Sequence, residues 1–224
     1  MGSWNIGPYI VLTNKFCLLG EGFRPQIIDR IKVATKLPIL VQRIYDEDLV
    51  GCLIAANSYG ILLPIQTSDD ELTQLKQFLE DSVAIKKLEL TGTHNNAFGN
   101  IFLLNDKKAV IHSLIYEKNR SKIDIIEDIL DVEVISFETD LTLALGSYVL
   151  VNSNGLVVSP LFNENEIEEL RRIFLIPRER TIISTINMGN PILRSGATAN
   201  DTSLLVGNRT SGVELARIYN ILIG

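Results

Sequence analysis

The chain has 224 residues, of which 46% are apolar and 21% charged, and a formal net charge of −6. These values are those of one globular domain and exclude a disordered chain. The longest apolar runs, such as residues 60–65, are too short to span a membrane, and residues 1–20 lack a signal-peptide pattern. We therefore expect a cytoplasmic protein, whose acidic charge suits a basic protein partner better than a nucleic-acid backbone.

A short signal recurs along the chain, in which a glycine is followed by apolar residues and then by an asparagine. In chain order its copies lie at residues 6–14, 50–64, 98–105, 145–155 and 195–200. The copy at 50–64 is the clearest, and we interpret it as a β-hairpin. The asparagines at its marker position recur at intervals of roughly 43 to 48 residues: Asn14, Asn57, Asn105, Asn152 and Asn200. This period predicts five units, approximately 1–44, 45–91, 92–138, 139–187 and 188–224.

The marker asparagine has a physical explanation. Asparagine at the start of a tight turn bonds the backbone two residues on, and a glycine three residues later can adopt a positive φ. Gly60 and Gly155 stand at that later position, whereas Lys108 and Ser203 replace the glycine in the third and fifth units. We therefore expect the third and fifth turns to close differently or to carry strain.

An amphipathic helix is predicted after each hairpin. The first covers about residues 26–34 without a clear cap, and the third opens at Ser121. Possible capping boxes open the second, fourth and fifth helices: Ser68 with Glu71, Asn163 with Glu166, and Ser211 with Glu214. A third strand follows the helix in four units, at residues 39–41, 83–85, 132–135 and 181–184.

The sequence thus predicts an α/β fold of five strand-strand-helix-strand repeats. The fifth unit lacks a third strand, because its helix reaches Gly224. Five similar blades favour a closed ring, in which residues 3–6 would complete the last blade. A linear solenoid is the competing arrangement, although it usually carries distinct polar caps at its ends.

Few residues are candidates for catalysis or for metal binding. His94 lies in a polar stretch and His112 closes a predicted strand, and neither has a second ligand at zinc-site spacing. Cys17 and Cys52 lie in apolar runs and are expected to be buried, reduced thiols. The acidic run at residues 46–48 is best explained as a solvated connection. We expect no catalytic residue, metal or cofactor.

The repeated hairpin and its Glu-led helix resemble the archaeal and eukaryotic translation initiation factor 6 family over the whole chain. The more specific segments are residues 50–64, 97–100 and 145–160. The resemblance implies a pentein fold, a five-bladed α-β propeller with pseudo-fivefold symmetry, without catalysis or cofactor. Members bind the intersubunit face of the large ribosomal subunit, block joining of the small subunit and act in large-subunit maturation. Eukaryotic members usually carry an additional C-terminal tail, so this chain resembles archaeal ones.

The same resemblance implies partners. The family contacts an interface ribosomal protein, the fourteenth of the universal large-subunit set, near the sarcin-ricin loop of the ribosomal RNA. A translational GTPase and a dedicated assembly factor would release the protein, which we expect to be a monomer. Arg194 departs from the glycine expected in the fifth unit of an archaeal member.

The contacting residues are a hypothesis. The residue after each repeat glycine should lie at the same end of each blade, which gives Pro8, Cys52, Asn100, Ser147 and Ala197. The polar stretch His94, Asn95 and Asn96 would extend this surface. The competing interpretation is that these positions vary without function.

Two other functions stay open at this stage. The same ring architecture supports enzymes that modify guanidino groups with a cysteine nucleophile late in the chain. No cysteine follows Cys52, which argues against such an enzyme. The third possibility is an unrelated ring-shaped scaffold that binds another protein.

Overall fold

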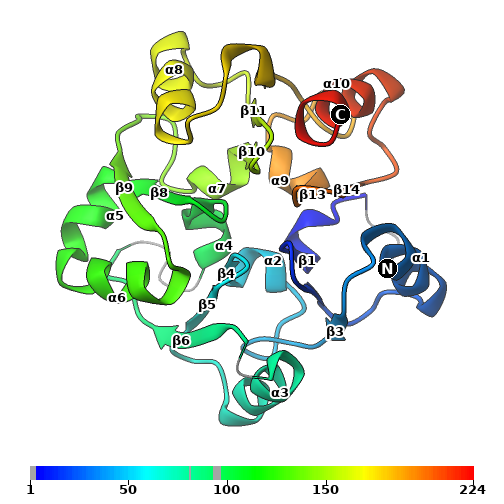
Figure 1. Ribbon diagram of the computed structural model, residues 1–224, viewed down its shortest axis with the longest axis vertical. Coiled ribbons are helices and arrows are strands. Elements are labelled where there is room, and N and C mark those ends of the chain that lie inside the picture. Colours follow the sequence, from blue (N-terminus) through cyan, green and yellow to red (C-terminus); the bar gives the residue numbers. More distant parts are fainter. Residues whose placement is uncertain (1–3, 81, 93–96) are drawn as a thin grey trace.

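The computed structural model describes residues 4–80, 82–92 and 97–224. Figure 1 shows five sectors around a central axis, with a small sheet in each sector and helices at the rim. The strands of each sheet come from one predicted unit, while the exact boundaries between units stay a prediction. This arrangement is the predicted α/β ring of five blades.

Four of the sheets have three strands. In each of them the first two strands are antiparallel and the third is parallel to the second. Their bounds are β1 (Ile10–Leu12), β2 (Cys17–Leu19) and β3 (Ile39–Val41); β4 (Ala55–Ala56), β5 (Gly60–Pro64) and β6 (Ala84–Leu88); β7 (Leu103–Leu104), β8 (Lys108–His112) and β9 (Glu133–Phe137); β10 (Val149–Val151), β11 (Leu156–Val158) and β12 (Thr181–Ile183). The four predicted third strands are therefore confirmed.

The fifth sheet has two strands, β13 (Ala197–Ala199) and β14 (Leu204–Val206). Residues 4–6, the described part of the segment expected to complete it, form no strand. The Trp4 carbonyl instead accepts a hydrogen bond from the Asn187 amide at 3.1 Å, and it lies where a side chain at Gly207 would be. The N-terminal segment thus reaches the end of β14 and does not pair along its edge.

The five predicted helices are present at the rim: α1 (Pro25–Thr35), α3 (Asp69–Leu79), α6 (Arg120–Leu130), α8 (Glu164–Ile173) and α10 (Gly212–Leu222). Capping boxes close the N-termini of α3, α8 and α10 as predicted. The expected start of the third helix at Ser121 is wrong. An unpredicted helix, α5 (Ser113–Lys118), precedes α6, and Asn119 occupies the N-cap position of α6. A 3-10 turn, η2 (Arg178–Arg180), leads into β12.

Each blade begins with a short helical turn that the hairpin interpretation missed. The bounds are η1 (Gly7–Tyr9), α2 (Val50–Leu53), α4 (Phe98–Ile101), α7 (Leu145–Tyr148) and α9 (Leu193–Gly196). The hairpin of the second unit accordingly starts at Ala55 and not at Val50. The turns contact one another in a cycle: α2 touches η1 and α4, α7 touches α4 and α9, and α9 touches η1. This cycle closes the ring and excludes an open solenoid.

The hydrophobic core is divided into clusters that consecutive blades share. Ala55 and Leu62 of the second blade pack with Phe98 and Ile126 of the third. Leu205 of the fifth blade packs against the cluster of the first. Because every blade buries apolar surface against its neighbours, one blade does not form a core by itself.

All five hairpin turns close in the same way, contrary to the expectation for the third and fifth. The backbone N–H of the first turn residue donates to the carbonyl of the fourth in Thr13–Phe16, Asn57–Gly60, Asn105–Lys108, Asn152–Gly155 and Asn200–Ser203. Thr13, and not Asn14, therefore occupies the marker position of the first unit. Gly60 and Gly155 do not adopt a positive φ. A side chain on either would overlap a helix carbonyl of the next blade, from Ile129 or Ile221.

None of the helices in the described part of the chain combines the length and the apolar character needed to cross a bilayer.

Candidate functional site

The five short helical turns gather around one end of the ring axis. They line a cavity of about 180 Å³ whose side chains include Pro8, Cys52, Asn100, Ser147, Arg194 and Ser195. We call this surface the helical-turn face. Four of the five residues predicted from the repeat glycine are therefore brought together, each from a different blade.

The structure does not bring the fifth predicted residue, Ala197, to this cavity. Ala197 is a fully buried residue of β13, and Ser195 lines the cavity in its place. The missed signal is a constant spacing: Gly51, Gly99 and Gly146 each stand six residues before the turn asparagine of their unit. By this spacing Arg194 is the counterpart of the glycines, and Ser195 is the residue that follows. His94, Asn95 and Asn96 lie outside the described residues.

The repeat glycines are required by the close approach of backbones. A Cβ at Gly51 would overlap the Gly7 carbonyl oxygen, and one at Gly99 would overlap that of Gly51. The Cβ of a residue at position 146 would likewise overlap the Phe102 carbonyl oxygen. The turns thus pack backbone against backbone, and the residue after each glycine is left to line the mouth of the cavity.

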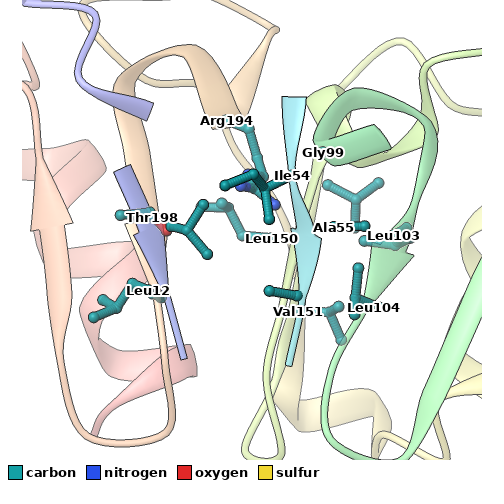
Figure 2. A pocket seen from close by; sticks show the side chains of 14 residues that line it. Leu12, Ile54, Ala55, Gly99, Leu103, Leu104, Leu150, Val151, Arg194 and Thr198 are labelled. Carbon is teal, nitrogen blue, oxygen red and sulfur yellow. The ribbon is translucent and has the colours of Figure 1, made fainter. Parts of the chain in front are cut away.

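Behind this mouth a central channel follows the axis, lined by the first strands β1, β4, β7, β10 and β13. Figure 2 shows the Arg194 side chain turned into this channel beside Ile54 and Leu150. Burial lowers the pKa of Arg194, and its interaction with Cys52 opposes this effect. A guanidinium nevertheless stays protonated in proteins, so the channel holds a positive charge.

The two thiols are not suited to nucleophilic catalysis. Burial raises the pKa of Cys17 to about 12. Burial also raises the pKa of Cys52, although Arg194 and a hydrogen bond with Asn100 partly offset the rise. Both sulfurs are free thiols, and Cys52 is half-buried where we expected full burial. Because a thiolate is the reactive species, both cysteines are poor nucleophiles at neutral pH.

The opposite end of the axis, which we call the hairpin-turn face, carries a ladder of amide side chains. The Asn57 amide donates to the Leu130 carbonyl at 2.7 Å, and the Asn152 amide donates to the Asn200 carbonyl at 2.8 Å. The Asn200 amide donates to the Thr13 carbonyl at 2.8 Å, which links the fifth blade to the first. The turns of the second, fourth and fifth units are thereby tied to the next blade.

Two carboxylates lie at the hairpin-turn face. The Asn14 amide donates to Asp106 at 2.8 Å and to Asp201 at 2.9 Å, and the Ser58 hydroxyl donates to Asp106 at 2.6 Å. These bonds satisfy the carboxylates within the ring. Among the described residues no cluster of three metal-ligating side chains is present.

His112 has a structural position. Its Nδ1 accepts the Leu114 backbone N–H at 3.0 Å as the N-cap of α5, and its Nε2 lies 2.8 Å from the Thr139 carbonyl oxygen. The ring is buried. Both nitrogens are therefore occupied by backbone groups and are not available to a substrate.

Comparison with known proteins decides the family. The sequence pattern that defines the eIF-6 family matches residues 1–221. The chain belongs to the eIF-6 family. It is 33% identical to the translation initiation factor 6 of Saccharolobus islandicus over 99% of this chain and 95% of that protein. It is 30% identical to eukaryotic translation initiation factor 6 of Dictyostelium discoideum, covering 98% and 87%, and of Saccharomyces cerevisiae, covering 98% and 86%. The relatives of this eIF-6 family member are translation initiation factors and not enzymes.

Solved structures with the same fold include enzymes. A dimethylarginine dimethylaminohydrolase superposes with a TM-score of 0.58 at 15% identity, covering 88% of this chain and 76% of the enzyme. The N-terminal domain of a cyanobacterial arginine dihydrolase gives 0.56 at 14% identity, covering 89% and 75%. At this identity the likeness shows the pentein fold alone, and the eIF-6 family determines function.

Proposed function

We propose that the chain binds the large ribosomal subunit at its intersubunit face and sterically prevents the small subunit from joining. The observation that carries this proposal is membership of the eIF-6 family over nearly the whole chain. The protein would act in the cytoplasm as a monomer and also take part in large-subunit maturation.

We place the contact on the helical-turn face. Blades with similar backbones present different groups there, including Pro8, Cys52, Asn100 and Ser147. To preserve the fold, each of these positions needs only a small residue. Recognition of a partner needs side chains that differ from one blade to the next. The hairpin-turn face, by contrast, uses its polar groups within the ring.

The partner on the subunit would be the interface ribosomal protein, fourteenth of the universal set, close to the sarcin-ricin loop. A net charge of −6 on this chain favours a basic protein as the main anchor, because complementary charge speeds association and orients the partners. Release would require a translational GTPase and an assembly factor.

Cosedimentation with separated ribosomal subunits tests the proposal. The protein should pellet with the large subunit alone, and adding it should reduce the joining of the two subunits. Asn100→Trp places a large side chain at the cavity mouth and should weaken binding by about tenfold or more, with little change in melting temperature. Lys107→Trp, at an exposed residue of a hairpin turn, is the matched control and should bind normally. Normal binding by Asn100→Trp, or loss of binding by Lys107→Trp, would remove the helical-turn face from the contact.

A further inference from the structure

Arg194 places a charge at the repeat position next to the mouth of the central channel. Its side chain enters the central channel (Figure 2). At this position the other four units have a glycine: Gly7, Gly51, Gly99 and Gly146. Apolar side chains, including Ile54 and Leu150, line the channel together with polar atoms of the inner strands. The Arg194 side chain is half-buried, and removing a guanidinium from water is costly unless an anion or hydrogen-bond acceptors replace the lost water.

The described residues supply no such replacement. Arg194 makes no ion pair and no hydrogen bond with the described residues, and no carboxylate lines the channel or its mouth. Asp106 and Asp201 lie at the hairpin-turn face, where the Asn14 amide binds both. The chain carries six more acidic than basic side chains, yet no acidic side chain of the described residues pairs with this cation.

The mouth of the channel offers space and neutral polar groups next to the cation. Its cavity of about 180 Å³ is far larger than one water, whereas the inner channel has only about 50 Å³. The Ser147 hydroxyl makes no hydrogen bond with the described residues, and the Asn100 amide lies against the Cys52 thiol. The Ser195 hydroxyl is already used, because it donates to the Ile192 carbonyl at 2.7 Å.

We propose that the mouth of the central channel is a binding site for a small oxyanion, in which Arg194 supplies the positive charge and Ser147 and Asn100 supply hydrogen-bond donors. The ligand class is a phosphate or carboxylate group. Charge-assisted hydrogen bonds from a guanidinium are the strongest available to such a ligand, and the neutral donors orient it. This site does not depend on ribosome binding and is a property of the free protein.

The test uses purified protein in a low-chloride buffer. Inorganic phosphate, and acetate in a separate series, is added at constant ionic strength with HEPES as the balancing anion. The melting temperature should rise with anion concentration and reach saturation, as linkage requires for a ligand bound to the folded state. A response to both anions assigns the site to oxyanions in general, and a response to one identifies the preferred group.

Variants of Arg194 test whether this residue binds the anion. Arg194→Ala and the uncharged Arg194→Gln should weaken anion binding by about tenfold or more, whereas Arg194→Lys should retain part of it. Arg30→Ala removes an exposed arginine of α1 and should respond like the unaltered protein. No saturable response in the unaltered protein, or the same response in Arg194→Gln, would overturn the proposal. Because all readings come from the free protein, failure here leaves the ribosome assay unaffected.

Discussion

Asn152 shows how much one amide side chain contributes to the ring. Its Nδ2 donates to the Asn200 and Leu222 carbonyls, both at 2.8 Å, so it binds the turn and the helix of the next blade. Its Oδ1 accepts the backbone N–H groups of Asn154 and Gly155 at 2.9 and 3.0 Å. The residue is 3% exposed. Every polar atom of the amide is therefore used away from water.

Asn152→Ala should lower the free energy of unfolding by about 3 kcal/mol, because it leaves buried carbonyl and N–H groups without partners. Urea denaturation of both proteins measures the difference. Asn165→Ala, at an exposed residue of α8, is the control and should stay within about 0.5 kcal/mol of the unaltered protein. A loss below about 1 kcal/mol for Asn152→Ala would mean that the ladder contributes little to stability.

For single residues, the sequence predicts what a side chain does better than it predicts which position of the repeat that residue occupies. Asparagine at the turn was predicted to bond the backbone two residues on, and Asn57 does so through Tyr59. In the first unit, Asn14 looks like the marker asparagine, but Thr13 occupies the marker position. The Thr13 hydroxyl accepts the Phe16 N–H there. In the same way, Gly196 looks like the repeat glycine of the fifth unit, although the spacing assigns that position to Arg194. Spacing is the safer guide, because the backbone geometry repeats where the side chains do not.

Capping boxes join the rim helices to the segments that carry the site. In α10 the Glu214 carboxylate accepts N–H groups from Ser211, Met188 and Gly189 and the Thr185 hydroxyl. Glu71 of α3 similarly accepts the N–H of Asp46 at 3.0 Å. Residues 45–46 and 187–188 all have positive φ and lead to α2 and α9. Each glutamate thus fixes a left-handed turn next to the helical-turn face.

Glu214 predicts a pH dependence of stability. Burial by itself would raise the pKa of Glu214, but the hydrogen bonds from Ser211, Gly189, Thr185 and Met188 outweigh it and lower the pKa to about 2. The folded-state pKa lies below the unfolded value of about 4.5, so the stabilisation is complete above that pH and is lost as the pH falls toward 2. Glu214→Gln should therefore cost about 2 kcal/mol at neutral pH, and the difference should narrow below about pH 4.5.

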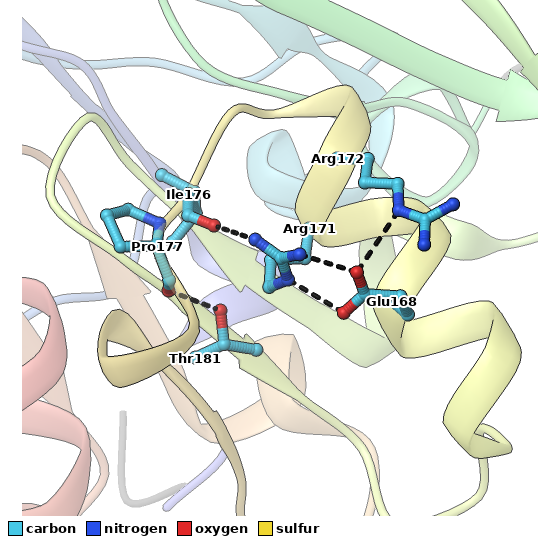
Figure 3. A network of polar contacts seen from close by, with 6 residues as sticks. All are labelled: Glu168, Arg171, Arg172, Ile176, Pro177 and Thr181. Carbon is cyan, nitrogen blue, oxygen red and sulfur yellow. Dashed lines mark hydrogen bonds and ion pairs between the residues drawn. The ribbon is translucent and has the colours of Figure 1, made fainter.

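A partly exposed glutamate, Glu168, provides the control. Figure 3 shows Glu168 of α8 bound to Arg171 and Arg172, while Arg171 also donates to the Ile176 carbonyl at 3.0 Å. The hydrogen bond from Arg171 is the largest cause that lowers the pKa of Glu168 to about 2. Because water and salt screen this pair, Glu168→Gln should change stability much less than Glu214→Gln. Equal losses in urea unfolding at neutral pH would contradict this interpretation.

Helices could be predicted from the sequence where the pattern of apolar residues was long enough to show a helical period. The three capping boxes and the apolar faces of eleven-residue helices such as α3 and α10 are clear in the sequence. Four-residue turns such as α2 and α4 give no period to detect, and their apolar residues continue into a strand. The sequence therefore predicts these segments as the first strand of a hairpin. The mouth of the channel is built from these turns, so four of its residues, Pro8, Cys52, Asn100 and Ser147, could be predicted from the repeat, but its geometry and Ser195 could not.

At the scale of the whole molecule, closure of the ring gives every blade stabilising contacts with a neighbour on each side. The clusters of the core join consecutive blades, including the fifth and first. The Ser203 hydroxyl donates to the Ala34 carbonyl at 3.3 Å across that last junction. Five units of similar backbone could be predicted from the period alone, but closure depends on contacts between residues nearly two hundred positions apart. A repeat pattern by itself does not determine such contacts.

Closure can be tested at Gly7, where a Cβ would overlap the Arg194 carbonyl oxygen. Gly7→Ala must push the first and fifth blades apart and should destabilise the protein by about 3 kcal/mol. Gly51→Ala forces apart the first and second blades and should cost a similar amount, because a ring has no free end. Gly212→Ala, with nothing near the added Cβ, should be neutral or stabilise by about 0.5 kcal/mol. Urea unfolding measures all three, and an open stack would make Gly7→Ala as harmless as Gly212→Ala while Gly51→Ala stayed costly.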